Sequence, residues 1–513
     1  MRRKIAALAA GALLVAVPVG CGKPGSQVGG VPAAAKMTPA NAVAFLEVVV
    51  DPSVSQKRDL LGLVQKFPIG SKQSDFASLK DQQLSRIFKD SGLDYVADVK
   101  PWLGATVSVA ALTDGDAPVP VIFVAATDTK KASAALDKAK ASTDTNTHLE
   151  GDYRIVGDTA VIVPSKNKGL VTKTLDQIDA QAKKEDTSLA KLAAFTKVIG
   201  SLKDEHVVLA YADPAAASRL VSAFAVNAGG ESSADAVTKA LNARGPIGID
   251  VHLAQNSAVL QGVEIQKGKA KHSGGKPELT AGLPADTTGA LTVFDLAAII
   301  DDALKSFGGF LGTSISSFED QVGVSLKNDI FPLIDGETVV VAGAIDKTTS
   351  IPDLALVTKP TDHAKAQAAF DRLKKAAAAK GEITDVTIAG KPGFQLAEVT
   401  SGIVPTAVLL DDRLIVASSK AYAESLAKSK GKGLASTDEF RGVVGAGSND
   451  GTTFQLLVRA APIRQAIERK LSGSERDTYN RDVAPNVAPI EAVGIKAIQS
   501  GDLTRFEIKV AFK

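Results

Sequence analysis

One cysteine has a position in the chain that predicts a chemical modification. Cys21 is the single cysteine among 513 residues, so an internal disulfide cannot be its purpose. It follows basic residues at positions 2–4, an apolar run over residues 5–17, and then Pro18-Val19-Gly20. A basic start, a short apolar run and small residues before a cut are typical of a secretory signal. We therefore predict a signal peptide over residues 1–20 and lipidation of Cys21.

Two features bear on this prediction. Pro18 stands where a lipoprotein signal usually has Leu, Val or Ile, which leaves ordinary cleavage after Ala33-Ala34-Ala35 open as an alternative. The apolar run would rise about 20 Å as a helix, short of the roughly 30 Å hydrocarbon core of a membrane, so a retained span is the weaker interpretation. Residues 21–37 are rich in Gly, Pro and Ala, and we expect them to form a lipid-anchored flexible tether.

Other residues that could do chemistry are scattered. No histidine is followed by a second one at the spacing that binds zinc on a helix. We expect His206 and His252, which lie beside apolar residues in predicted strands, to be hydrogen-bonded structural histidines. The five histidines are His148, His206, His252, His272 and His363. With Cys21 used as an anchor, no thiol nucleophile remains, and we predict neither a metal site nor a cofactor.

Two short motifs and two acidic pairs have structural explanations. Ser165-x-x-Lys168 and Ser425-x-x-Lys428 match half of a serine acyl-transferase signature, whose Lys-Thr-Gly partner is missing. Ser165 and Ser419 are better explained as helix caps. Asp301-Asp302 falls in a predicted helix, and Asp411-Asp412 falls in a turn between strands, where Asp is favoured. We therefore predict that the protein is not an enzyme, with a hydrolase using scattered carboxylates as an alternative.

The composition is that of an ordinary globular protein. Hydrophobic residues make up 45% and charged residues 23% of the chain. Removal of the three basic residues of the signal would change the formal net charge from +2 to −1. A nearly neutral body lacks the basic face that nucleic acid requires, so we expect no nucleic-acid partner.

The sequence also repeats itself. Asp98 and Pro101 match Asp329 and Pro332, and the runs that open at Asp128 and Asp362 share an Ala-rich pattern. Further matches in unbroken order pair Phe195 with Phe440, Trp102 with Leu333, Leu209 with Leu457, and Pro214 with Pro462. These matches predict a tandem duplication, with homologous domains at 38–266 and 280–513 and a linker at 267–279.

Each predicted domain alternates strands with amphipathic helices. Apolar, β-branched stretches at 43–50, 106–112 and 119–125 predict strands, with counterparts at 290–294, 338–344 and 354–358. Asp51, Asp128 and Asp362 are expected helix caps, with Pro52 in the first turn after Asp51. Two hairpins, 247–254 with 259–266 and 492–499 with 503–512, close the domains. Helices mixed with hairpins predict an α+β fold with mainly antiparallel sheets.

Several short motifs resemble a known family. They are Thr38-Pro39-Ala40-Asn41-Ala42-Val43-Ala44-Phe45, Asp51-Pro52 with Gln56, Phe67-Pro68, and Asp98 followed by Pro101-Trp102-Leu103-Gly104. Together they resemble an uncharacterised family of bacterial envelope proteins known as domain of unknown function 3352. The resemblance covers nearly the whole mature chain and implies an envelope protein without assigned activity. It brings no functional residues to carry over. Trp102 itself is expected to be a buried anchor.

These observations lead to one expectation about function. We expect a lipoprotein held on the extracytoplasmic face of the cell membrane, with a non-catalytic binding or structural role in the envelope. Its expected partners are the membrane, through the lipid anchor, and another envelope component. A carrier of a lipid or other apolar ligand is the leading alternative, because sheets backed by amphipathic helices can enclose an apolar cavity.

Overall fold

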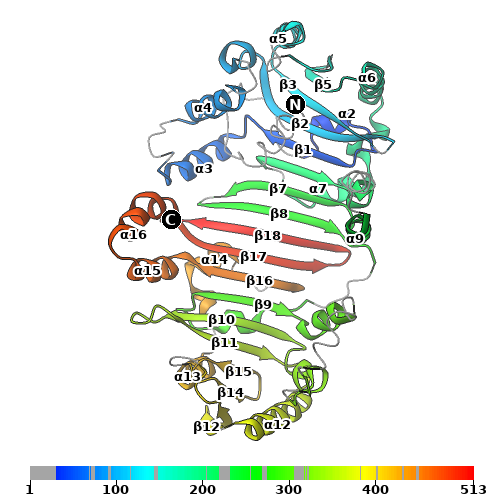
Figure 1. Ribbon diagram of the computed structural model, residues 1–513. Helices are drawn as coiled ribbons and strands as arrows, with labels where there is room; N and C mark the ends of the chain where they lie inside the picture. The colour runs from blue at the N-terminus through cyan, green and yellow to red at the C-terminus, as the bar shows by residue number, and fades with distance from the viewer. Residues whose placement is uncertain are drawn as a thin grey trace. The chain divides into compact units, whose positions relative to one another are not determined.

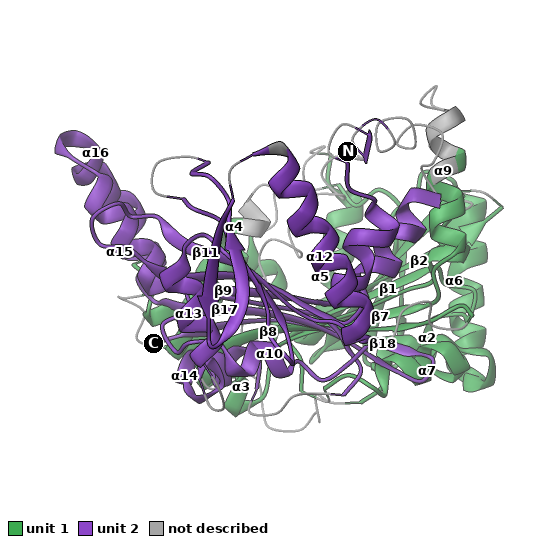
Figure 2. Ribbon diagram, turned by 90° about the horizontal axis from the view of Figure 1, so that it is seen from below, with its two compact units in different colours: residues 1–268 green, residues 269–513 purple. Residues whose placement is uncertain are grey.

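The computed structural model contains two compact units, residues 1–268 and 269–513 (Figure 2). It describes residues 30–513 except 69, 71–74, 90–93, 116, 144–147, 204, 219–230, 255, 269–273, 306–316, 318, 321–322, 382, 400–402, 430–432 and 446–449. In that part of the chain no helix is both long enough and apolar enough to cross a membrane.

Unit 1 alternates strands with helices (Figure 1). Its strands are β1 (Ala44–Val49), β2 (Leu103–Asp114), β3 (Ala117–Ala126), β4 (Asp152–Val156), β5 (Thr159–Val163), β6 (Val208–Ala212), β7 (Ile247–Ala254) and β8 (Ser257–Ile265). Its helices are α2 (Ala33–Met37), α3 (Val54–Gln65), α4 (Phe76–Lys89), α5 (Thr129–Ala141), α6 (Lys168–Lys183), α7 (Ala193–Ile199) and α9 (Glu231–Asn242). Shorter helical turns are η1 (Tyr95–Val99), η2 (Glu185–Thr187) and η3 (Leu189–Lys191).

The strands of unit 1 form an antiparallel sheet in the order β4-β5-β3-β2-β1-β6-β7-β8. Side chains alternate between its faces, as strand geometry requires. One face carries Phe45, Phe195 from α7 packs edge-on against it, and Tyr211 contacts Phe195 in turn. On the other face α5 packs through Leu136 with Trp102, and α3 packs through Leu60. Unit 1 therefore has apolar cores on both faces of its sheet.

The described residues of unit 2 include ten strands. They are β9 (Gly289–Phe294), β10 (Glu337–Ile345), β11 (Pro352–Lys359), β12 (Thr384–Ile388), β13 (Lys391–Gln395), β14 (Thr406–Leu409), β15 (Leu414–Ala417), β16 (Thr452–Arg459), β17 (Ile490–Ser500) and β18 (Leu503–Phe512). The described helices are α10 (Glu278–Gly282), α12 (His363–Lys380), α13 (Lys420–Lys428), α14 (Asp438–Val443), α15 (Ala460–Lys470), α16 (Gly473–Thr478) and α17 (Ala484–Val487). Helical turns are η4 (Leu326–Ile330), η5 (Phe331–Leu333), η6 (Leu434–Ser436) and η7 (Tyr479–Val483).

The strands of unit 2 follow the same plan. They form an antiparallel sheet in the order β12-β13-β14-β15-β11-β10-β9-β16-β17-β18. The last eight positions repeat the order of unit 1, with β14 and β15 in the places of β4 and β5, and the hairpin β12–β13 is added at the end. The larger core lies on one face of this sheet and includes Val339, Val341, Leu457 and Phe440. On the other face, α12 packs through Phe370.

The α+β class and the antiparallel sheets are confirmed, and the predicted strands and closing hairpins occur within a few residues of their expected bounds. Asp128 and Asp362 cap α5 and α12 as expected, and Ser419 caps α13. Two expected caps are wrong. The cap of α3 is Ser53, while Asp51 pairs with Lys57 at 2.5 Å and Pro52 precedes the helix.

The cap of α6 is the second correction. Asn167 accepts the Leu170 N–H, and Ser165 instead accepts the N–H of Asn167. The expected tether also ends earlier than residue 37, because residues 33–37 form α2. Within α2, Ala34 is 6% exposed and Ala35 is 0% exposed. The folded part of the chain therefore begins before residue 38.

Candidate functional site

The predicted modification site lies outside the described residues. Cys21 precedes residue 30, as does the signal over residues 1–20. The nearest described element is α2, which contacts α6 and η3. Its last turn leads to Thr38, whose hydroxyl donates to the Ala34 carbonyl at 2.8 Å. A chain attached at Cys21 would therefore enter unit 1 through a short helix that is packed in the fold.

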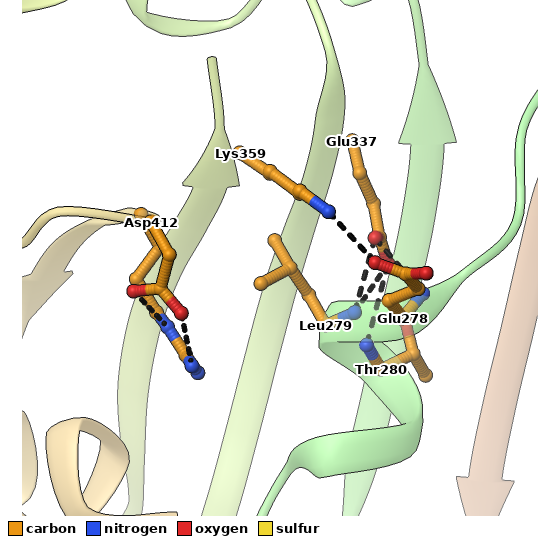
Figure 3. A network of polar contacts seen from close by, with 7 residues as sticks. Glu278, Leu279, Thr280, Glu337, Lys359 and Asp412 are labelled. Carbon is orange, nitrogen blue, oxygen red and sulfur yellow. Dashed lines mark hydrogen bonds and ion pairs between the residues drawn. The ribbon is translucent and has the colours of Figure 1, made fainter. Parts of the chain in front are cut away.

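A buried carboxylate holds the start of unit 2 (Figure 3). Glu337, at the beginning of β10, is 4% exposed. It accepts the N–H groups of Glu278 and Leu279 at 3.0 Å and that of Thr280 at 3.3 Å, so it binds the first turn of α10. Lys359 on β11 pairs with the Glu278 carboxylate at 2.7 Å. Figure 3 shows both carboxylates next to the beginning of α10.

The electrostatics of Glu337 follow from this geometry. Burial raises the pKa of its carboxyl to about 7, although the three N–H groups and the Lys359 charge act in the opposite direction. A carboxyl with a pKa near neutrality has the value that a general base needs. Here both oxygens already accept backbone N–H groups inside the protein. The arrangement serves to anchor α10 to the sheet.

Unit 1 has a different set of buried polar groups. His206 Nε2 lies 3.5 Å from Glu47 Oε1, and His252 Nδ1 lies 2.5 Å from Asp250 Oδ1. All four residues are less than a tenth exposed. His206 and His252 are therefore partnered structural histidines in the described fold, in agreement with the expectation from the sequence. Their carboxylate partners were not expected.

The remaining described histidines bind backbone oxygens, and one lies outside the described residues. His363 Nε2 is 3.1 Å from the Leu410 carbonyl, and His148 Nδ1 is 2.9 Å from the Ser142 carbonyl. His272 is outside the described residues. Within the described ranges, no group of three or more His, Cys, Asp and Glu side chains is arranged to hold a metal ion.

The motif residues singled out in the sequence have structural positions. Trp102 is 5% exposed, and its Nε1–H donates to the Asp98 carbonyl at 2.7 Å. Leu333, its match in unit 2, is 3% exposed. Gln56 is 4% exposed, and its amide both donates to and accepts from the backbone of Leu253 in β7. Three residues on which the family resemblance or the internal repeat rests are thus packing positions.

The acidic pairs are ordinary surface ion pairs. Asp301 and Asp302 both face Lys305, at 2.5 and 3.8 Å. Asp411 and Asp412 lie in the turn between β14 and β15 and pair separately with Lys391 and Arg413. Neither pair brings two carboxylates to one shared partner in a buried site.

The matched residues Asp98 and Asp329 perform the same task in the two units. Asp98 pairs with Lys138 on α5 at 2.6 Å, and Asp329 pairs with Arg372 on α12 at 2.5 Å. Burial tends to raise the pKa of the Asp329 carboxyl, but the Arg372 guanidinium and the Ser325 N–H outweigh it and lower that pKa below its usual range. Each aspartate ties a helical turn to the helix that follows β3 or β11.

A row of apolar side chains crosses the face of the unit 2 sheet that is opposite to the side chains of Val339, Val341 and Leu457. Cross-strand pairing aligns six positions, one from each of β11, β10, β9, β16, β17 and β18. All six are aliphatic and none is buried; Val340 is 49% exposed, and Leu354, two residues from the row on β11, is 48% exposed. The row is Leu356, Val340, Leu291, Leu456, Ile495 and Ile508. A sheet face open to water normally carries polar residues.

Comparison with known proteins places the chain in a family. The model of DUF3352, described as a protein of unknown function, matches residues 4–511. The chain belongs to the DUF3352 family. This confirms both the resemblance seen in the short motifs and its extent over nearly the whole mature chain. Curated proteins give no match.

Three solved structures have a weak likeness to this DUF3352 protein. They are crystal forms I, IV and III of TP0453, with 14%, 12% and 12% sequence identity. The matches cover 47%, 46% and 46% of this chain and 82%, 93% and 80% of the other chains. The TM-scores are 0.23, 0.25 and 0.22, too low to assign a fold or a function.

Proposed function

We propose that this DUF3352 protein is an exported lipoprotein, anchored through Cys21 to the extracytoplasmic face of the cell membrane, with a non-catalytic binding role in the cell envelope. The observation that carries the proposal is the packing of α2. Cleavage after Ala35 would remove Ala34 and Ala35, which unit 1 buries. Cleavage before Cys21 keeps both residues and leaves α2 complete. The structure of unit 1 thus favours the earlier of the two cleavage sites considered.

The geometry between the anchor and the fold supports this proposal. Pro32, which precedes α2, lies eleven positions after Cys21. Fully extended, they would reach about 35–40 Å. Such a length would let the folded body stand away from the membrane surface. Stable attachment would need more than one acyl chain, since a single chain binds only marginally.

The test is the fate of the full chain in a bacterial host. Wild type is expected in the membrane fraction, with a mature N-terminus at Cys21 whose mass includes acyl chains. Cys21→Ser should leave the membrane fraction or accumulate uncleaved. In a control variant, Cys21→Ser is combined with Ser26→Cys, which places a cysteine five positions after the original one. This control should behave like Cys21→Ser. An unmodified mature N-terminus at Lys36 would rule out the lipid anchor.

A second candidate function is the transport of a lipid. It is favoured by the aliphatic row on unit 2, which offers no polar side chain and therefore suits a hydrocarbon chain. A membrane anchor would hold this face close to a source of lipid. The proposed occupant is an acyl chain of a phospholipid.

Transfer of a fluorescent phospholipid between vesicles would test the lipid-carrier function. Val340→Lys places a charge in the aliphatic row at a half-exposed position, so the fold should tolerate it. We expect transfer to drop several-fold in this variant. The control is Val54→Lys on α3 of unit 1, where Val54 is 82% exposed and does not belong to the row. Equal transfer by wild type and Val340→Lys would exclude the row as the lipid site.

A further inference from the structure

The aliphatic row of unit 2 lies on the same side of the sheet as a helix with basic side chains. None of the described helices lies in front of the middle of β9, β16, β17 and β18, which carry most of the row (Figure 1). Helix α15 begins directly after β16 and contacts β10 and β17. Figure 2 shows α15 and α16 on the same side of the unit 2 sheet as α12, with α10 and α14 on the other side. Helix α15 therefore borders the open apolar face.

The equivalent face of unit 1 is covered at the same place. Strand order and cross-strand pairing put Val48 and Val107 of unit 1 in the positions of Leu291 and Val340. Both unit 1 valines pack against the apolar cluster to which α3 contributes Leu60. Val340, by contrast, is half-exposed. An open apolar surface at these positions is thus a property of unit 2.

Exposed aliphatic side chains lead from the row to the β10–β11 turn. Val340 and Leu356 belong to the row, Leu354 lies on the same face of β11, and Ile351 lies in the turn. We call these four side chains the apolar strip. Val340, Leu354 and Ile351 are 48 or 49% exposed.

The length of the apolar strip suits one acyl chain. From Ile351 to Leu356 an extended backbone rises by about 17 Å. One leaflet of a bilayer contributes half of the roughly 30 Å hydrocarbon core, so an acyl chain reaches about 15 Å. A single chain of a phospholipid could therefore cover the strip from the turn to the row.

The turn end of the strip lies beside the last turn of α15. Arg469 Nε donates to the hydroxyl of Ser350 at 3.4 Å, and Ser350 directly precedes Ile351. Lys470 is the last residue of the helix. Both basic residues are exposed, and within the described part of the chain neither forms an ion pair. Two unpaired positive charges are thus available where the strip ends.

The helical geometry of α15 separates these charges from the nearest acidic residue. Successive residues of a helix are about 100° apart around its axis. Arg469 and Lys470 then lie within about 60° of the buried Ala466, whereas Glu468 lies about 160° away from it. The basic side chains are therefore on the half of α15 that faces the fold, and Glu468 is on the outer half.

The β10–β11 turn adds little charge of its own. Asp346 accepts the N–H groups of Thr348 and Thr349 at 2.8 and 2.7 Å, so its carboxylate is already engaged. Lys347, next to it, carries the opposite charge. The charge that α15 adds at this end of the apolar strip is positive.

We propose that the apolar strip and α15 bind an anionic phospholipid, with one acyl chain over Leu354 and Val340 and the phosphate group beside Arg469 and Lys470. The proposal rests on the lipid-carrier function proposed above and names its substrate class. A zwitterionic phospholipid offers the same acyl chain, but the positive charge of its headgroup offsets the attraction to the two basic side chains. Since exposed charge pairs are weak, the preference for the anionic lipid should be about two- to fivefold.

Transfer of fluorescent phosphatidylglycerol and fluorescent phosphatidylcholine with identical acyl chains tests the proposal. All donor vesicles contain the same fraction of unlabelled phosphatidylglycerol, so the attraction of the protein to the vesicle surface is equal in both experiments. We expect the full chain to transfer phosphatidylglycerol about two- to fivefold faster. Equal rates would overturn the proposal and leave the carrier function intact. Transfer of neither lipid would contradict both.

Variants locate the headgroup contact and the acyl-chain contact separately. Arg469→Gln with Lys470→Gln removes both charges from exposed positions, and the two transfer rates should become equal. Arg505→Gln is the matched control and should keep the preference, because Arg505 is exposed and its pairing with Ile498 places it on the opposite face of the sheet. Leu354→Gln should slow the transfer of both lipids alike. A folded double variant with the wild-type preference, or wild-type transfer of both lipids by Leu354→Gln, would overturn the proposal.

Discussion

Glu337 is a buried carboxyl group, and burial disfavours its negatively charged form. Its carboxyl has a pKa of about 7 in the fold, against 4.5 for an ordinary glutamate. The unfolded chain therefore releases this proton at lower pH than the folded chain. The resulting contribution to stability is present in full below about pH 4.5 and is lost as the pH rises through 7. Its size is about 3 kcal/mol at most.

Replacement of Glu337 by Gln should remove this dependence. We expect the free energy of unfolding of Glu337→Gln, measured with urea, to approach that of wild type near pH 4.5. Between pH 5 and 8 the variant should gain on wild type, because it has no proton to lose. The control is Glu468→Gln, an exposed glutamate on α15, which should follow the wild-type curve. Parallel curves for wild type and Glu337→Gln would contradict the assignment.

At the scale of single residues, the sequence predicts whether a side chain is buried better than it predicts which residue that side chain contacts. Trp102 as a buried anchor and the structural role of His206 and His252 follow from apolar neighbours alone. The carboxylates that these histidines contact could not be predicted. Glu47 and His206 are 159 positions apart, and only the pairing of β1 with β2 and β6 brings them together. No local pattern carries that information.

At the scale of helices and strands, a helix cap can be predicted from a few neighbouring residues. Ser419 accepts the Tyr422 N–H at 3.2 Å and caps α13. Ser419→Ala should lower the free energy of unfolding by about 1 kcal/mol, because one amide at the helix start loses its acceptor. Ser425→Ala, an exposed position in the same helix, is the control and should cost little. Chemical denaturation of both variants gives the comparison, and equal losses would argue against the cap.

Helix α2 offers a second test at this scale. Ala35 is 0% exposed, whereas Ala33 in the same helix is exposed. Ala35→Glu should destabilise unit 1 by more than about 2 kcal/mol, since it forces a charge into a packed site. Ala33→Glu adds the same charge at the surface and should be nearly neutral. Thermal unfolding of the two variants measures the difference. Equal midpoints would show that α2 is not a packed part of unit 1.

Two helix caps were predicted at the wrong residue because two residues that can cap a helix lie close together in each case. Asp51 and Ser53 are both good caps, as are Ser165 and Asn167, and composition cannot choose between residues two positions apart. In the structure Asp51 is engaged by Lys57, which leaves Ser53 for α3. Helix α2 was missed for another reason. Five residues with three alanines carry almost no periodic signal, and the burial of Ala35 depends on contacts with α6 and η3.

Across the whole molecule, the two units share the order of eight strands, and unit 2 adds the hairpin β12–β13. The ancestral duplication that this order suggests stays a prediction from the sequence repeats. Repeats in unbroken order could predict similar topology. They could not predict which buried positions diverged, because cross-strand neighbours are set only by the fold: Glu47 lies opposite Leu209, whereas Ala290 lies opposite Leu457, the residue that the repeats match with Leu209.

We expect each unit to fold without the other. Each has its own antiparallel sheet and its own apolar clusters, which are the usual requirements for an independent domain. We expect fragments 30–268 and 274–513 to give cooperative thermal transitions by circular dichroism. Refolding of the full chain under the same conditions is the control for reversibility. Two fragments without any cooperative transition would show that neither unit is stable alone.

The placement of the indole gives the molecule a built-in asymmetry for spectroscopy. Trp102 is the only tryptophan in the chain, it is packed against α5 in unit 1, and its match in unit 2 is a leucine. Emission excited in the long-wavelength absorption band of indole therefore originates from unit 1 alone. A fluorescence titration with denaturant or ligand therefore reports on unit 1. A change confined to unit 2 should leave the tryptophan emission unaltered.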